Sequence, residues 1–135
     1  MQDRRDFLKT TAAAASVLAI SSVPRTFAAG TAMYTNIIFT KENPGMWAGK
    51  EGSHAPEITV TGSKVAVVTK HPMSEKHFIF KHTLVLGDGT YVGGMLFTPA
   101  DKPESSYELP PGYKGKIYAT SFCNLHDFWL TETII

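Results

Sequence analysis

The distribution of apolar and β-branched side chains along the chain predicts a protein built from β-strands. Seven short segments are rich in valine, isoleucine, threonine and aromatic residues, which favour extended backbone. They are residues 34–40, 57–62, 64–70, 77–86, 90–98, 116–122 and 128–134. Beyond residue 28, no segment sustains the 3.6-residue apolar period of a helix. The pattern therefore predicts an all-β, immunoglobulin-like β-sandwich of about seven strands.

Glycine and proline separate these segments. Gly62-Ser63, the sequence GDG at 87–89, and the stretches 98–106 and 109–115 are all typical of turns. The segment 41–53 contains three glycines and no strand pattern. It is predicted to be a long loop, and loops of this length in compact domains are often functional.

The first 28 residues are predicted to be an export signal. Arg4 and Arg5 precede an apolar run from Ala12 to Ile20, and the sequence TFA at 26–28 suits a signal peptidase. The pattern resembles the twin-arginine class of signal. About nine apolar residues are too few to span a bilayer, which needs roughly 20. We therefore expect a signal at 1–28, one domain at 29–135, and a periplasmic location.

The charge of the remaining 107 residues gives no support to a nucleic acid or a membrane as a partner. Of the 13 basic and 12 acidic side chains, four and two fall in the predicted signal. That leaves nine basic and ten acidic side chains, without a basic cluster. The length is that of one domain.

The chain has a single cysteine, Cys123, which cannot form an internal disulfide. An oxidising compartment favours paired cysteines, so a lone exported thiol is either a buried, inert core residue or a metal ligand. His126 follows three residues later, close enough for thiolate and imidazole to reach one ion. Both groups suit late first-row metals. Taken alone, this pair leaves both interpretations open.

Four of the five histidines fall at predicted turns or strand ends: His54, His71, His77 and His126. Prolines at 56 and 72 bias the backbone before them toward extended conformations, and such positions can aim several side chains at one point. The fifth, His82, lies an odd number of residues after His77 within one predicted strand. Strand alternation sends the two to opposite faces, so His82 is predicted to be a surface or half-buried residue outside any site.

Together these motifs resemble the iron centre of superoxide reductases of the neelaredoxin and desulfoferrodoxin type. The matching elements are His54-Ala55-Pro56, His71-Pro72 with His77, and Cys123-Asn124-Leu125-His126 followed by Trp129. The resemblance extends from about Gly49 to Thr133. Its most specific stretch is GKIYATSFCNLH at 115–126.

The resemblance implies one iron ion per chain, cycling between Fe²⁺ and Fe³⁺. Its ligands would be four equatorial imidazoles and an axial thiolate, from His54, His71, His77, His126 and Cys123. A sixth position, opposite the sulfur, would receive superoxide, which is reduced by one electron to hydrogen peroxide. A small redox protein would supply the electron. Relatives with one iron are often homotetramers, so a homo-oligomer is the assembly that the resemblance suggests.

The chain departs from the family pattern just before the first ligand. Many members carry Glu-Lys there, the lysine attracting superoxide and the glutamate capping ferric iron, whereas this chain has Gly52-Ser53. Lys50 and Glu51 lie just upstream in reversed order. They are the candidate catalytic residues that the resemblance leaves for these roles.

Two further departures concern cysteine and glycine. The four-cysteine iron centre of some members cannot form with Cys123 alone, so the resemblance is to the one-iron type. Asp127 stands where the family commonly has glycine after the last ligand. Aspartate tolerates left-handed backbone better than most residues, so the turn is expected to survive.

An alternative from another class is an exported electron carrier of the blue-copper kind, without superoxide chemistry. It would use one upstream histidine with Cys123 and His126. Such sites usually add a weak methionine ligand after the last histidine, and none of the five methionines follows Cys123. A metal-free β-sandwich that binds a partner would leave the four placed histidines unexplained.

Overall fold

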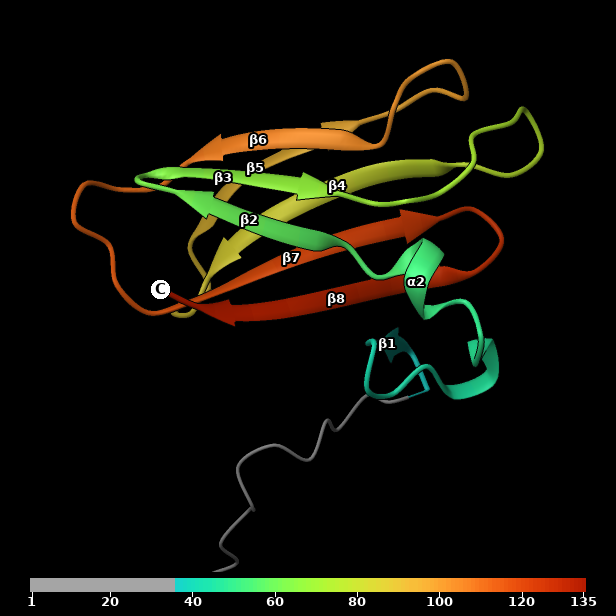
Figure 1. Ribbon diagram of the computed structural model, residues 1–135, viewed down its shortest axis with the longest axis horizontal. Coiled ribbons are helices and arrows are strands. Elements are labelled where there is room, and N and C mark those ends of the chain that lie inside the picture. The colour runs from blue at the N-terminus through green and yellow to red at the C-terminus, as the bar shows by residue number, and fades with distance from the viewer. Residues whose placement is uncertain (1–35) are drawn as a thin grey trace, which may run out of the picture. The chain divides into compact units, whose positions relative to one another are not determined.

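A computed structural model describes residues 36–135, so the predicted signal, 1–28, lies outside the described residues. The chain forms two facing β-sheets with almost no helix (Figure 1), which confirms the predicted all-β sandwich. Between residues 36 and 135 there is no helix long and apolar enough to cross a membrane. The strands are β1 (Ile38–Phe39), β2 (Glu57–Thr61), β3 (Lys64–Val68), β4 (Ile79–Leu86), β5 (Tyr91–Leu96), β6 (Glu104–Glu108), β7 (Lys116–Cys123) and β8 (Asp127–Ile134).

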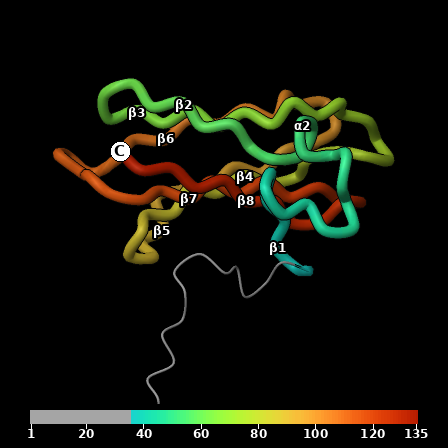
Figure 2. Tube along the Cα trace, turned by 60° about the horizontal axis from the view of Figure 1, so that its bottom comes forward, coloured from blue at the N-terminus to red at the C-terminus, as the bar shows by residue number. Residues whose placement is uncertain are grey.

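The larger sheet has five strands in the order β1-β8-β7-β4-β5, and the smaller has three in the order β2-β3-β6. Figure 2 shows the two layers one above the other. All neighbouring strands are antiparallel except β1, which runs parallel to β8 and pairs Ile38 with Phe128. Because most neighbouring strands are antiparallel, the turns and loops that connect them lie at the two ends of the sandwich.

The core between the sheets follows from alternation along the central strands. Val65 and Val67 of β3 face inward from the small sheet, and Leu84 and Ile117 face them from the large one. All four side chains are fully buried. Burying such a side chain contributes about 1.5–3 kcal/mol, so this cluster is a main source of stability.

All seven predicted segments contain a strand, and an eighth strand, β6, was missed. The predicted turn stretch 98–106 covers the first three residues of β6, because Pro99, Asp101 and Pro103 are typical of turns. Serine replaces an apolar residue at the buried position Ser105, and Tyr107 is half-buried on the same face. The loop prediction for 41–53 also needs correction, since this segment contains a 3₁₀ turn, η2 (Gly45–Trp47), and the start of a short helix, α2 (Glu51–His54).

The prediction that His82 is a surface or half-buried residue was wrong, because the predicted strand 77–86 is not regular. His77 precedes β4 and forms an isolated bridge with Ser74, and the register of β4 against β7 shifts between Ile79 and Lys81. Such a bulge breaks the two-residue alternation. His82 consequently faces the core and is fully buried.

Candidate metal centre

Five side chains from three separate segments converge at one end of the sandwich. His54 ends helix α2, and His71 and His77 lie in the loop between β3 and β4. Cys123 ends β7, and His126 lies in the turn to β8. Figure 1 shows α2 beside the turn between β7 and β8. All five residues predicted from the sequence as ligands are thus brought together, and His82 is not among them.

The ligand atoms are evenly spaced. His126 Nδ1 lies 3.0 Å from His54 Nε2 and 3.0 Å from His77 Nε2, which is itself 3.0 Å from His71 Nε2. Cys123 Sγ lies 3.7 Å from His126 Nδ1 and 3.8 Å from His71 Nε2. Potential ligand atoms of His54, His77, Cys123 and His126 all lie within 4.8 Å of one another.

This spacing fits a metal ion better than hydrogen bonds among the rings. A ring nitrogen has one in-plane site, either a lone pair or a proton. His77 Nε2 and His126 Nδ1 each have two imidazole nitrogens at 3.0 Å, so one site would have to serve two bonds. Three successive nitrogen–nitrogen separations of 3.0 Å, from His54 through His126 and His77 to His71, are short enough for one ion to contact several of these nitrogens at a normal metal–imidazole distance of about 2.0–2.1 Å. The donor set therefore fits one ion.

Burial prepares two of the imidazoles for metal binding. His54 and His71 are buried, and burial lowers the pKa of each to about 4. Their rings are consequently neutral at neutral pH, the form that coordinates a metal. His77 and His126 are half-buried, so solvent reaches the centre from their side.

The backbone before the first ligand fixes the orientation of the His54 ring. Nδ1 lies 3.1 Å from the carbonyl of Lys50 and 2.8 Å from the hydroxyl of Ser53. When Nδ1–H donates to this carbonyl, Nε2 keeps its lone pair for the metal. Helix α2 ends at His54, as expected where Pro56 disfavours helical backbone at Ala55.

The turn after Cys123 supports the thiol. Burial raises the pKa of Cys123, and hydrogen bonds from the backbone N–H groups of Leu125 and His126 act in the opposite direction. Asp127 has a φ of 64° and is the one non-glycine residue between 36 and 135 with positive φ. The turn accordingly survives the replacement of glycine by aspartate, as predicted.

Asn124 holds the two loops of the centre together, a role that the sequence did not reveal. Its Oδ1 accepts a hydrogen bond from the N–H of Phe78 (3.0 Å), and its Nδ2 donates to the carbonyl of Lys76 (3.0 Å). These bonds fall on either side of His77. The only sequence signal was its place in the motif Cys123-Asn124-Leu125-His126.

Two tryptophans flank His126. Trp47 of η2 makes an edge-to-face contact with its ring, with centroids 4.6 Å apart, and donates a hydrogen bond from Nε1 to Asp127 Oδ2 (3.0 Å). Trp129 is fully buried and donates from Nε1 to the carbonyl of His126 (2.8 Å). The loop before α2 thus packs directly on the turn that carries the last candidate ligand.

The two upstream charged residues differ in their relation to the centre. The pKa of His126 is lowered mainly by burial and, to a smaller extent, by the positive charge of Lys50. The charge of Lys50 therefore acts on a candidate ligand. Glu51 accepts a hydrogen bond from the N–H of Gly49, with both oxygens 3.0 Å from the nitrogen. These backbone hydrogen bonds lower the pKa of Glu51 and tie its carboxylate to its own loop.

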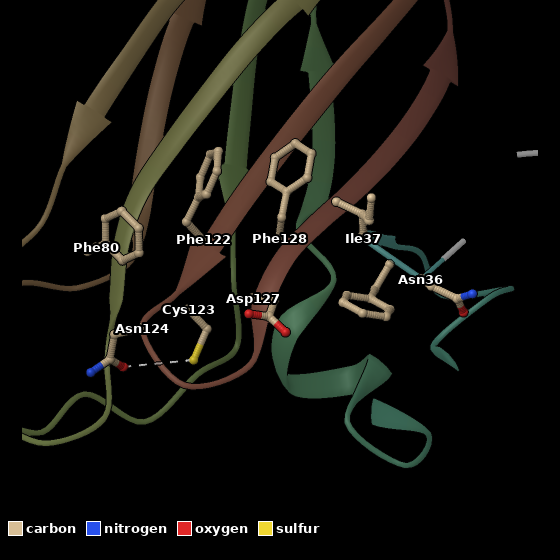
Figure 3. Close-up of a pocket in the computed structure, with 9 residues that line it drawn as sticks. Asn36, Ile37, Phe80, Phe122, Cys123, Asn124, Asp127 and Phe128 are labelled. Atoms are coloured by element: carbon tan, nitrogen blue, oxygen red, sulfur yellow. Dashed lines mark hydrogen bonds between the residues drawn. The ribbon is translucent and has the colours of Figure 1, made fainter. Parts of the chain in front are cut away.

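An apolar groove on the large sheet reaches the centre from outside the sandwich. Phe80, Phe122 and Phe128 lie side by side on three neighbouring strands, and Cys123 and Asp127 line the groove beside them (Figure 3). The ring centroids of Phe122 and Phe128 are 4.5 Å apart. Cys123 is thus buried between the core and this groove.

Comparison with known proteins gives one family. The family model described as Desulfoferrodoxin matches residues 46–132. A desulfoferrodoxin from Syntrophotalea carbinolica is 35% identical over 63% of this chain and 65% of its own length. A superoxide reductase from Pyrococcus abyssi is 30% identical over 65% of this chain and 90% of its own length.

A solved structure gives the same result for the fold. A single-residue variant of the superoxide reductase (neelaredoxin) from Ignicoccus hospitalis superposes with a TM-score of 0.68 and 25% identity. The match covers 77% of this chain and 97% of that one. The chain spans about two thirds of the length of the desulfoferrodoxins it matches, 65% for the Syntrophotalea protein.

Proposed function

Since this chain belongs to the desulfoferrodoxin family, we propose that it is a superoxide reductase. It binds one iron ion through His54, His71, His77, His126 and Cys123. The observation that carries the proposal is the convergence of four imidazole nitrogens, three successive pairs of which are 3.0 Å apart, beside a thiol sulfur. The likeness to the superoxide reductase from Pyrococcus abyssi supports the choice of superoxide as the substrate.

The proposed reaction balances with one electron and two protons. Superoxide takes them up and leaves as hydrogen peroxide, and no dioxygen is formed. Iron held by these five residues would supply the electron by passing from Fe²⁺ to Fe³⁺. A small redox protein returns the electron from outside.

The residues of this chain prepare the site for that reaction. Neutral rings at His54 and His71 present lone pairs without releasing a proton. The N–H groups of Leu125 and His126 favour the thiolate form of Cys123. Lys50 supplies the positive charge that attracts the superoxide anion. Glu51, in the same loop, is the candidate carboxylate for capping ferric iron.

Metal analysis with electron paramagnetic resonance of the isolated protein tests the proposal. We expect one iron per chain, a visible thiolate-to-iron charge-transfer band in the oxidised protein, and rapid oxidation of the ferrous protein by superoxide. Copper hyperfine structure would instead support a blue-copper electron carrier. Iron that does not react with superoxide would refute the reductase.

Substitution of the thiol separates a ligand from a core cysteine. Cys123→Ser should abolish the charge-transfer band and slow the release of peroxide, because serine offers no thiolate to the metal. Leu125→Ala is the matched control, since Leu125 is 52% exposed in the same turn, and it should keep the band. An unchanged spectrum in Cys123→Ser would exclude Cys123 as a ligand.

The proposal includes export to the periplasm by the twin-arginine route. Its basis is Arg4 and Arg5 ahead of the apolar run from Ala12 to Ile20. This route carries proteins that are already folded, which suits a protein that acquires its metal before crossing.

A further inference from the structure

Four polar side chains form a hydrogen-bonded chain inside the sandwich, where apolar contacts are the rule. We call it the core polar chain: Ser105, His82, Thr69 and Ser121. His82 Nδ1 lies 2.9 Å from Ser105 Oγ, and His82 Nε2 lies 2.8 Å from Thr69 Oγ1, which is 2.9 Å from Ser121 Oγ. Each of the four residues is at most 6% exposed.

The core polar chain carries a cost that apolar side chains would avoid. Burying a hydroxyl or an imidazole is unfavourable unless its hydrogen bonds are made. Here both ring nitrogens of His82 have partners, and Phe97 closes the side of its ring with centroids 4.8 Å apart. Satisfied polar networks are directional, so they fix the relative position of their members more tightly than apolar packing does.

The core polar chain crosses between the two sheets. His82 and Ser121 lie opposite one another in the β4–β7 ladder of the large sheet. Ser105 belongs to β6 of the small sheet, and Thr69 extends β3, with its N–H donating to the carbonyl of Pro103 (3.0 Å). The bonds from His82 to Ser105 and to Thr69, and from Thr69 to Ser121, therefore tie one sheet to the other.

The same two sheets carry the candidate ligands. Thr69 lies two residues before His71, and its carbonyl accepts a hydrogen bond from the N–H of His71 (2.8 Å). Ser121 lies two residues before Cys123, on the same face of β7. The hydrogen bond between Thr69 and Ser121 thus links the segment that carries His71 to the strand that carries Cys123. The ligand atoms of those two residues are 3.8 Å apart.

We propose that His82 is a positioning residue of the metal centre, acting through Thr69 and Ser121. Its hydrogen bond to the Thr69 hydroxyl, together with the bond from Thr69 to Ser121, sets where the His71 ring stands relative to the Cys123 sulfur. The proposal rests on the proposed function, because the property that it controls is the bond between thiolate and metal.

The experiment compares variants of the full chain, each isolated with its iron. Thr69→Val keeps the shape of the side chain and removes the hydroxyl that joins His82 to Ser121, and His82→Leu removes the imidazole. Thr69→Ser restores the hydroxyl. Thr83→Val is the matched control, since Thr83 is a buried neighbour of His82 whose hydroxyl pairs with Thr120, outside the core polar chain.

The readouts are the energy of the thiolate-to-iron band, the reduction potential, and the denaturant midpoint of unfolding. Thr69→Val and His82→Leu should shift the band and the potential, and Thr69→Ser should return both to the parent values. Thr83→Val should lower the denaturant midpoint and leave the band energy and the reduction potential unchanged. A purely structural role would lower the midpoint in all of these variants and leave band and potential unchanged, which would overturn the proposal.

Two provisions keep the test decisive. If His82→Leu does not fold, Ser105→Ala removes only the far end of the core polar chain and should shift the band in the same direction as Thr69→Val, and an unshifted band in Ser105→Ala would then count against the proposal. If the parent protein itself shows no thiolate band, the proposed function fails, and with it the premise. A parent band that no variant shifts refutes the role of His82 alone.

Discussion

At the scale of single residues, the candidate ligands divide by their exposure. His54 and His71 are buried, and Nδ1 of His54 lies 3.1 Å from the Lys50 carbonyl. His77 and His126 are half-buried. A small anion therefore reaches the centre from the half-exposed side, where the charge of Lys50 also acts on His126.

The first residue-scale prediction concerns Lys50. If its charge attracts superoxide, Lys50→Ala should lower the second-order rate constant for oxidation of the ferrous protein, roughly two- to tenfold, and flatten its dependence on ionic strength. Iron content and visible spectrum should not change. Pulse radiolysis at several salt concentrations measures both quantities.

Lys114 supplies the control, because it is exposed in the loop between β6 and β7, at the other end of the sandwich from α2 (Figure 1). Lys114→Ala should leave the rate and its salt dependence near those of the parent. Equal rates for Lys50→Ala and the parent would exclude Lys50 from attracting the substrate.

The second residue-scale prediction concerns the titration of His82. Burial lowers its pKa to about 4 from 6.5, so between these values the unfolded chain binds a proton that the folded chain does not. The free energy of unfolding of the metal-free protein should therefore fall as the pH decreases from 6.5 to 4. A shift of this size is worth on the order of 3 kcal/mol from His82.

Urea unfolding of the metal-free protein at several pH values measures this dependence. His54 and His71, whose pKa values burial also lowers to about 4, contribute in the same direction. His82→Leu should therefore have a shallower slope than the parent but not a flat one. Equal slopes would show that His82 titrates normally in the folded chain.

At the scale of elements, the turn between β7 and β8 is where the loop before α2 meets the large sheet. Asp127 contributes to this contact in two ways. Its backbone adopts positive φ in the turn, and its carboxylate accepts the hydrogen bond from Trp47. Asn124 joins the same turn to the loop that contains His77. Three segments distant in sequence are thereby fixed around one point.

The element-scale prediction compares replacements of Asp127. Asp127→Ala loses the acceptor for Trp47 and places alanine in left-handed backbone, which costs roughly 1–2 kcal/mol. Asp127→Gly loses the acceptor without that strain, so it should be more stable than Asp127→Ala by about 1 kcal/mol. Asp127→Asn, which keeps an acceptor and tolerates this backbone, is the control.

Urea midpoints for the three variants test the ranking asparagine, glycine, alanine. Trp47 fluorescence reports whether its hydrogen bond is lost in the glycine and alanine variants. A glycine variant no more stable than the alanine variant would mean that the positive φ of Asp127 carries no strain.

At the scale of the whole molecule, the candidate metal centre joins both sheets of the sandwich. His54 and His71 flank strands of the small sheet, whereas Cys123 and His126 belong to the end of the large one. Metal binding should therefore depend on the folded sandwich. The export that we propose, by a route that carries folded chains, would deliver the protein with its metal already bound.

The whole-molecule prediction concerns that route. Replacement of Arg4 and Arg5 together by lysine should abolish export and leave the protein, with its iron, in the cytoplasm, because the twin-arginine pair is lost while the charge is kept. Fractionation of cells followed by immunoblotting measures the distribution. Lys9→Arg is the control and should be exported normally. Continued export of the double variant would argue for another route.

The sequence by itself predicted most of the strands, and its resemblance to superoxide reductases supplied the set of candidate ligands. Period-two alternation and turn residues are local signals, so all seven predicted segments contain a strand. The motifs around His54, His71 and Cys123 are also local, and they pointed to residues that the structure brings together. Strand β6 was not predicted, because its buried position is occupied by Ser105 rather than by an apolar residue.

Only the tertiary structure decided the surroundings of the centre. The bulge in β4 turns His82 into the core, and no local pattern indicates a bulge there. The contacts from Trp47 to Asp127 and from Asn124 to the loop around His77 join residues about 50 to 80 positions apart. Such contacts depend on which strands lie side by side and on how the loop before α2 packs on the large sheet, which a one-dimensional pattern of polar and apolar residues does not encode.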